Sequence, residues 1–267
     1  MRTGLSSCGK EINEELFKSY AAAGIEVMEI SVNFSECLNF DFEGTAALAK
    51  KYGIELWSFH LPFMPFSDID ISSPKICEKT LDCLKMLIDK GSAVGIKRFI
   101  VHPSGEPIIS AEKRGIRMQT SKQSLKILAQ YADERGAVIA VEDLPRTCLG
   151  RNSDEILELI SADDRLGVCF DTNHLLSEKI TDFIKRVGSR IITTHISDYD
   201  FVDEKHWLPG EGKINWQELY KALCETGYDA VWLYELGFKS PSTLERERDL
   251  TCFDFSENAK KILNGEL

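Results

Sequence analysis

Short apolar runs alternate with longer amphipathic stretches along most of this chain. Eight of the runs are rich in Val, Ile and Phe and carry apolar residues on both faces, which is the pattern of strands covered on two sides. They predict strands over Arg2–Ser6, Ile25–Val32, Glu55–His60, Arg98–His102, Val138–Glu142, Leu166–Asp171, Arg190–His195 and Ala230–Glu235.

The stretches between these strands repeat their apolar residues every three to four positions, as amphipathic helices do. They predict helices over Glu11–Ala23, Pro74–Val94, Glu112–Glu134, Ser153–Ile160, Asn215–Thr226 and Leu244–Leu263. Ser73 is expected to cap the second helix, with Pro74 at its first position. The charged run Leu244–Asp249 is expected to form the solvated face of the last helix, where i,i+4 pairs form.

Eight strands that alternate with helices predict an α/β fold, a (β/α)8 TIM barrel, rather than an open sheet. The 267 residues are close to the roughly 250 that such a barrel needs. Five glycines (Gly24, Gly53, Gly95, Gly136 and Gly227) stand where helices should end before strands. No linker or second domain is visible, so we expect one domain over residues 1–267.

The composition indicates a soluble globular protein, with 43% hydrophobic and 28% charged residues. A net charge of -11 argues against nucleic acid as a partner, since phosphates are neutralised by clustered Lys and Arg. The eight cysteines form no C-x-x-C pair, and no stretch resembles a secretion signal or a membrane span. We therefore expect reduced thiols, a cytoplasmic location and no membrane partner.

Polar residues that can bind metals stand where six of the predicted strands end. They are His60, His102, Glu142, Asp171, His195 and Glu235, and His174 follows three residues after Asp171. The fifth histidine, His206, lies in the loop after His195. In a parallel barrel these strand ends open onto one face, where active sites form. One such residue is more often structural, but six at matching positions are hard to explain as packing.

The last four of these strands end in Glu142, Asp171, His195 and Glu235. Three carboxylates and one imidazole form a mixed oxygen and nitrogen site that suits Mn²⁺, Mg²⁺, Co²⁺ or Zn²⁺. No Lys or Arg stands at the neighbouring strand ends to pair with these carboxylates, which would repel one another without a cation. The sequence therefore predicts one bound divalent metal ion.

An ordered set of short motifs accompanies these residues, one for each βα unit. They are Ser-Phe-His60-Leu-Pro, Val-His102-Pro, Val-Glu142-Asp, Phe-Asp171-Thr-Asn-His174, Thr-His195-Ile-Ser-Asp198, His206-Trp-Leu-Pro-Gly-Glu-Gly-Lys-Ile-Asn-Trp216 and Tyr-Glu235-Leu. With these motifs the chain resembles the sugar phosphate isomerase/epimerase branch of the xylose isomerase-like TIM barrels, over nearly its whole length. It also shares features with endonuclease IV.

The resemblance to ketose epimerases of this superfamily implies a metal-dependent sugar, or sugar-derived ketone, isomerase or epimerase. In those enzymes the positions of Glu142, Asp171, His195 and Glu235 bind one divalent metal. The two glutamates also act as acid and base on opposite faces of the substrate, and the position of His174 contacts a substrate oxygen. Proton transfer beside a carbonyl then passes through an enediolate.

The substrate is a small sugar or polyol ketone in this interpretation, and His60, His102, His174, Lys205 and His206 are its expected contacts. Ketose epimerases usually place a substrate-binding arginine shortly after the histidine of strand seven, where this chain has Phe201 and Val202. Lys205 or His206 could replace it. Five aromatic residues (Trp57, Phe59, Phe63, Phe66 and Trp207) flank the expected mouth, where they either stack on sugar faces or pack the loops.

Other functions remain open at this stage. Endonuclease IV binds three zinc ions, and its ligands match the strand-end residues together with His174 and the segment Glu204-Lys205-His206, so a phosphodiesterase with up to three zinc ions is one alternative. Segments 31–36 and 63–68 lack the basic residues that would hold a DNA backbone. An inosose or keto-polyol dehydratase and a non-catalytic sugar-binding barrel are further alternatives, and the chain could form a homo-oligomer. Glu211, in the turn 209–212, disfavours a phosphorylated substrate.

Overall fold

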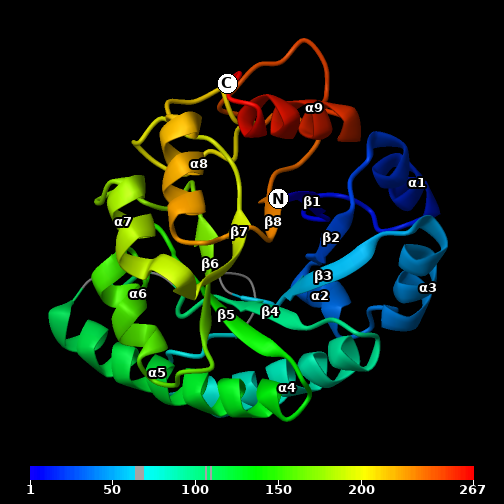
Figure 1. The fold of residues 1–267 in the computed structure, drawn as a ribbon. Coiled ribbons are helices and arrows are strands. Elements are labelled where there is room, and N and C mark those ends of the chain that lie inside the picture. The colour runs from blue at the N-terminus through cyan, green and yellow to red at the C-terminus, as the bar shows by residue number, and fades with distance from the viewer. Residues whose placement is uncertain (64–68, 106, 109) are drawn as a thin grey trace.

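Eight parallel strands form a nearly closed barrel with helices around it, as predicted (Figure 1). The computed structural model describes residues 1–63, 69–105, 107–108 and 110–267. Neighbouring strands follow the order β7-β6-β5-β4-β3-β2-β1-β8. Their bounds are β1 Arg2–Ser6, β2 Val27–Ile30, β3 Glu55–His60, β4 Arg98–Val101, β5 Val138–Glu142, β6 Gly167–Asp171, β7 Ile191–His195 and β8 Val231–Tyr234. All eight strands therefore lie within the segments that the sequence predicts.

The barrel closes between β7 and β8 through an irregular seam. One bridge joins Ile196 to Tyr234, and the Ile196 amide donates a hydrogen bond to the Leu233 carbonyl at 2.8 Å. The Thr194 hydroxyl donates to the Val231 carbonyl at 3.0 Å and accepts from the Leu233 amide at 3.4 Å. A side chain thus replaces part of the backbone ladder at this seam.

Helices cover the outside of the barrel. They are α1 Glu14–Ala23, α2 Phe34–Cys37, α3 Phe42–Tyr52, α4 Cys77–Ala93, α5 Ala111–Asp133, α6 Ser153–Ile160, α7 Ile180–Val187, α8 Trp216–Glu225 and α9 Cys252–Leu263, with a short 3-10 turn at Gly188–Arg190. The five glycines named above all have positive φ, between 66° and 93°. That left-handed conformation ends a helix at little cost when the residue lacks a Cβ.

Two helix starts differ from the prediction. Ser73 and Pro74 do not begin α4, because the Ser73 carbonyl accepts the amides of Ile76 and Cys77 in a separate turn before the helix. The last helix begins at Cys252, where Thr251 and Asp254 form a capping box. The helices α2, α3 and α7 were not predicted from the hydrophobic pattern.

The charged run 244–249 is not a helix face, so that prediction is wrong as well. Arg246 instead forms two hydrogen bonds with Glu211, at 2.8 and 2.7 Å, and so joins the loop after β8 to the loop after β7. Arg248 pairs with Asp254 at 2.6 Å and thereby supports the start of α9. Neither pair lies within one helix, because Glu211 belongs to a distant loop and Asp254 to the first turn of α9, after the charged run.

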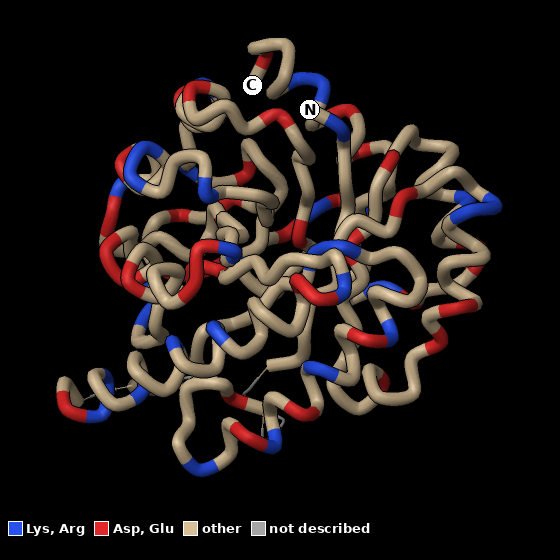
Figure 2. The backbone as a smooth tube through the Cα atoms, turned by 60° about the horizontal axis from the view of Figure 1, so that its bottom comes forward, with Lys and Arg blue, Asp and Glu red and all other residues tan. Residues whose placement is uncertain are grey.

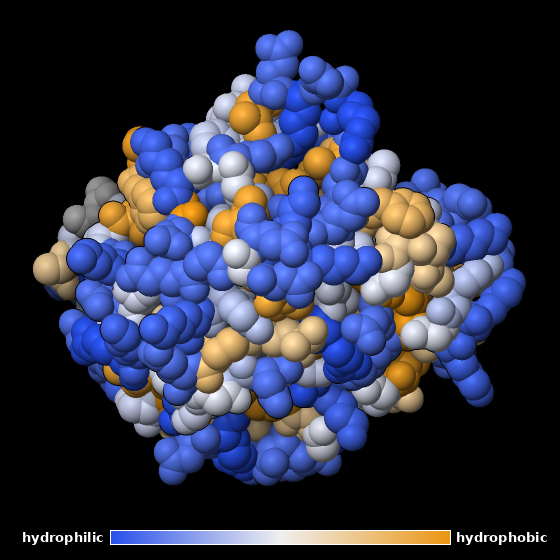
Figure 3. All heavy atoms as spheres, turned by 45° about the horizontal axis from the view of Figure 1, so that its top comes forward, coloured by the Kyte–Doolittle hydropathy of each residue, from blue (hydrophilic) through white to orange (hydrophobic). Residues whose placement is uncertain are grey.

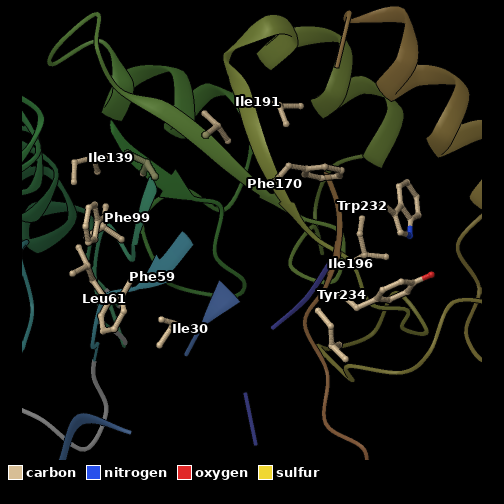
Figure 4. Packing of buried hydrophobic residues seen from close by; sticks show 14 of the residues in the cluster. Ile30, Phe59, Leu61, Phe99, Ile139, Phe170, Ile191, Ile196, Trp232 and Tyr234 are labelled. Atoms are coloured by element: carbon tan, nitrogen blue, oxygen red, sulfur yellow. The ribbon is translucent and has the colours of Figure 1, made fainter. Parts of the chain in front are cut away.

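Apolar side chains fill both the layer between barrel and helices and the barrel interior below the mouth. Figure 4 shows the first of these, with Phe59, Phe99, Phe170 and Trp232 among the packed residues. Two smaller clusters fill the interior: Val27, Trp57, Val231 and Leu233, and Ile100, Ala140 and Cys169. At Gly4, on β1, a Cβ would lie 2.6 Å from a Val27 methyl carbon, so only glycine fits there.

The interior clusters explain where the polar residues point. Side chains two positions apart on a strand share a face, so the residues that follow Ile100, Ala140, Cys169 and Leu233 by two also face inward, one layer higher. Those residues are His102, Glu142, Asp171 and Glu235. The polar site is therefore the top layer of a filled barrel.

The outer surface is strongly polar. Acidic and basic residues alternate along the outer helices in Figure 2, and hydrophilic side chains predominate on the face in Figure 3, with small hydrophobic groups between them. Among the described residues, no helix has both the length and the apolar character that crossing a membrane requires.

Candidate metal centre

Four residues from the last four strands converge at the mouth of the barrel. Glu142, Asp171 and His195 end β5, β6 and β7, and Glu235 follows β8. His195 lies between the carboxylates, with its Nδ1 2.9 Å from Glu142 Oε1, 3.0 Å from Glu235 Oε2 and 3.9 Å from Asp171 Oδ2. Each of the four offers a ligand atom within 4.8 Å of the others. The structure thus brings together the predicted metal ligands.

A second donor group adjoins the first through Glu142. The Nε2 atoms of His60 and His102 lie 3.1 and 3.0 Å from Glu142 Oε2, while its Oε1 faces His195. Both histidines come from strand ends, His60 from β3 and His102 from the residue after β4. Glu142 is therefore shared between two groups that could each hold an ion.

A third donor group consists of His174, Glu204 and His206. His174 Nε2 lies 3.4 Å from Glu204 Oε2. Glu204 and His206 belong to the loop after β7. The side chain of Asn173, which follows β6, holds this loop by accepting the backbone amides of Lys205, at 2.9 Å, and His206, at 3.4 Å. The ammonium group of Lys205 lies 3.9 Å from Asp200, and it is no part of this donor group because a charged ammonium has no lone pair to offer.

Hydrogen bonds orient four of the five histidine rings. When one ring nitrogen donates its proton to a protein acceptor, the other is left with the lone pair that a metal needs. The acceptors are the Leu61 carbonyl for His60 Nδ1, at 3.0 Å, the Asp143 carbonyl for His174 Nδ1, at 2.7 Å, the Glu235 carbonyl for His206 Nδ1, at 3.2 Å, and the Glu29 carboxylate for His195 Nε2, at 3.0 Å.

The donor set fits a divalent cation. Asp171 Oδ2, an oxygen of the first group, is buried and has no hydrogen-bond partner among the described residues. Among the residues that the structure describes, Glu142, Asp171 and Glu235 form ion pairs only with histidines. A buried carboxylate oxygen with no donor is costly, and a cation would satisfy it.

The electrostatics of the mouth are those of carboxylates that share protons with imidazoles. Burial would raise the pKa of Glu142, but the nearby His195 and His102 hold it well below its ordinary value. Burial would likewise lower the pKa of His60, but the hydrogen bond to Glu142 and its charge raise that pKa to about 9. Because metal ligands must be deprotonated, protons and a divalent cation would compete for these groups.

Sequence reasoning missed two residues beside the site. Glu29, on β2, is fully buried and contacts His195. Its signal was a charged residue inside an apolar run, and the structure shows that it follows the inward-facing Val27 by two positions. Arg146, in the loop after β5, lies 2.8 Å from Asp203 and 2.9 Å from Glu204. An arginine therefore does reach the loop after β7, although from another part of the chain.

The aromatic residues divide into those that flank the mouth and those that do not. Phe63 stacks on the ring of a mouth histidine at 3.8 Å and is 42% exposed. Trp57 belongs to the interior cluster below the site, and Phe59 is buried outside the barrel wall, so placing these two at the mouth was wrong. Trp207 donates its ring N–H to a threonine at 3.0 Å, and Phe66 lies outside the described residues.

The profile of the xylose isomerase-like TIM barrel family matches residues 17–251. The chain belongs to this family. A solved D-tagatose 3-epimerase-like protein superimposes with a TM-score of 0.83 at 23% identity, covering 100% of this chain and 98% of that one. At 23% identity this similarity shows that the two proteins share a fold.

The proteins that are similar to this chain in sequence include three kinds. An uncharacterized protein of Methanocaldococcus jannaschii is 26% identical over 69% of this chain, which spans 65% of that relative's length. Fructoselysine 3-epimerase of Shigella flexneri is 22% identical over 88% of this chain and 90% of the relative. A probable endonuclease 4 of Thermoplasma acidophilum is 23% identical over 62% of each chain.

Proposed function

We propose that this family member is a divalent metal-dependent isomerase or epimerase, which moves a proton at a carbon next to the carbonyl of a sugar or sugar-derived ketone. The proposal depends on one observation. Carboxylate oxygens of Glu142 and Glu235 lie 2.9 and 3.0 Å from the same atom, His195 Nδ1, and Asp171 lies beside them. The fructoselysine 3-epimerase among the relatives and the ketose 3-epimerases among the structural neighbours support it.

Each residue then has a defined task. Glu142 and Glu235 come from strands separated by two others, so they approach a bound carbon from different sides, one as base and the other as acid. Histidines at the rim, among them His174, would donate hydrogen bonds to substrate oxygens. A divalent ion held by the four ligands would polarise the carbonyl and a neighbouring hydroxyl group.

The test is exchange of a carbon-bound hydrogen with solvent. Purified protein, analysed for its metal content, is incubated in D₂O with ketoses and with inosose, and both deuterium incorporation and products are measured. We expect incorporation that a chelator abolishes, and the product separates epimerisation, isomerisation and dehydration. If no such ketone incorporates deuterium in metal-loaded protein, the proposal is wrong.

A second candidate, a phosphodiesterase with several zinc ions, is favoured by one specific observation. The first two donor groups share Glu142, and His174 of the third group lies 3.9 Å from Glu142 Oε1, so the three groups adjoin one another. Clustered ions in such an arrangement can act on both oxygens of a phosphodiester. Three zinc ions per chain, together with hydrolysis of a phosphodiester and no deuterium exchange, would replace the first candidate with this one.

A further inference from the structure

Glu29 is a buried carboxylate inside the barrel that contacts the candidate metal centre from the side opposite the mouth carboxylates. Its Oε1 and Oε2 lie 3.0 and 3.1 Å from His195 Nε2, and the Ser58 hydroxyl donates to Oε2 at 2.7 Å. All three side chains are fully buried. Burying a carboxylate away from water costs free energy unless hydrogen bonds to the charged group offset that cost.

We propose that Glu29 is a positioning residue that fixes which nitrogen of His195 faces the metal. With Nε2–H committed to Glu29, the lone pair of Nδ1 points at the space between Glu142 and Glu235. A carboxylate on the remote ring nitrogen also makes an imidazole a stronger ligand. This inference rests on the metal centre of the proposed function.

The local strand geometry brings Glu29 to this position. The β2–β3 register shifts between Met28 and Glu29, so that Met28 stands opposite Leu56 but Glu29 stands opposite Ser58. A corresponding shift on the other side of the barrel, between Val168 and Cys169, sets Asp171 opposite His195. Such irregularities commonly redirect side chains next to functional sites. Here they align the carboxylate, its hydroxyl donor and the histidine in one row across the barrel.

The experiment compares zinc binding by the wild-type protein with that of three variants. Glu29→Gln keeps the shape but removes the charge, and Ser58→Ala removes only the supporting hydroxyl group. Glu26→Gln is the matched control, because Glu26 is an exposed residue just before the same strand. Zn²⁺ affinity is measured by competition with a chromophoric chelator, and the His195 ring resonances of ¹⁵N-histidine-labelled, zinc-loaded protein are recorded.

We expect Glu29→Gln to bind Zn²⁺ about 10- to 100-fold more weakly, with an upfield shift of the His195 Nε2–H proton. Ser58→Ala should show the same changes at smaller size, and Glu26→Gln should match the wild type. A folded Glu29→Gln protein with wild-type affinity and an unshifted Nε2–H resonance would overturn the inference. If Glu29→Gln does not fold, an unchanged Ser58→Ala protein overturns it.

Failure of the proposed function gives different results. Wild-type protein that binds no Zn²⁺ contradicts the metal centre, and the role of Glu29 with it. Wild-type protein that binds Zn²⁺ but exchanges no substrate hydrogen contradicts only the isomerase activity, and the comparison of the variants then still decides the role of Glu29.

Discussion

Glu142 and Glu235 differ in how the surrounding residues use them, although both contact His195. Glu142 has histidines on both of its oxygens, whereas Glu235 is bonded through one oxygen and its side chain is 13% exposed. Glutamine keeps the shape of either residue and an oxygen for a metal but cannot exchange a proton. We therefore expect Glu142→Gln and Glu235→Gln each to lower turnover by about 10²–10⁴-fold with the fold intact.

Kinetics with the most active ketose and circular dichroism of each variant test this expectation. The double variant should lose less than the product of the single losses, since groups that act as a unit are not additive. In a two-base epimerase, one single variant should still incorporate deuterium while forming no epimer. Wild-type turnover in either variant would reduce that glutamate to a ligand or a bystander.

His195 should decide metal retention. Its Nδ1 lies within 3.0 Å of two carboxylates, so replacing it removes the only nitrogen ligand of the first donor group among the residues described. We expect His195→Ala to lose most of its metal on mild dialysis, as measured by elemental analysis. Unchanged metal content would mean that the ion lies in another donor group.

Residues at strand ends could be predicted from the sequence because each polar residue interrupts an apolar run at the same point of a βα unit. Glu29 could not be found that way, because it lies inside its strand, between Met28 and Ile30, and not at the end of an apolar run. Trp57 and Phe59 were misplaced because the shift in register beside Ser58 is invisible in the sequence. Which residues of a strand face inward depends on such shifts.

The hydroxyl of Thr194 is expected to stabilise the contact between β7 and β8, where the barrel closes. Its buried hydroxyl bonds both the Val231 carbonyl and the Leu233 amide across the seam. Thr194→Val preserves the shape but removes the hydroxyl partner of the Leu233 amide, whereas the Val231 carbonyl keeps the hydroxyl of Tyr228 at 2.6 Å. Chemical denaturation should show a loss of about 1–3 kcal/mol in the free energy of unfolding. An unchanged free energy of unfolding would show that the seam does not depend on this hydroxyl.

Helix boundaries illustrate what local pattern can and cannot predict. The last helix was expected eight residues too early, because the charged run 244–249 has helical composition, but Arg246 bonds to Glu211 in a distant loop. The whole of α3 was not predicted, although Asp41 caps it by accepting the Gly44 amide at 2.8 Å, and a Cβ at Gly44 would lie 2.2 Å from that carboxylate. Long-range contacts and caps decide both cases.

At the scale of the whole molecule, the net charge of -11 bears on the nuclease alternative. Binding a DNA backbone needs a basic surface, and Figure 2 shows basic residues interspersed with acidic ones. We expect no cleavage of a duplex with an abasic site at physiological salt by zinc-loaded protein. Efficient cleavage that a chelator abolishes would contradict this expectation, and an authentic endonuclease IV serves as the positive control.

The irregular seam between β7 and β8 affects how often the barrel opens locally. His195 and Glu235 stand on opposite sides of that seam, so an ion that holds both would fasten the two edges of the sheet together. The amides of Ile196 and Glu235, bonded across the seam at 2.8 and 3.2 Å, should then exchange with deuterated water far more slowly in metal-loaded than in metal-stripped protein. Amides between β4 and β5, away from the seam, should change little. Metal binding would thus slow the transient separation of β7 from β8, which opens the closed barrel into a sheet with two free edges.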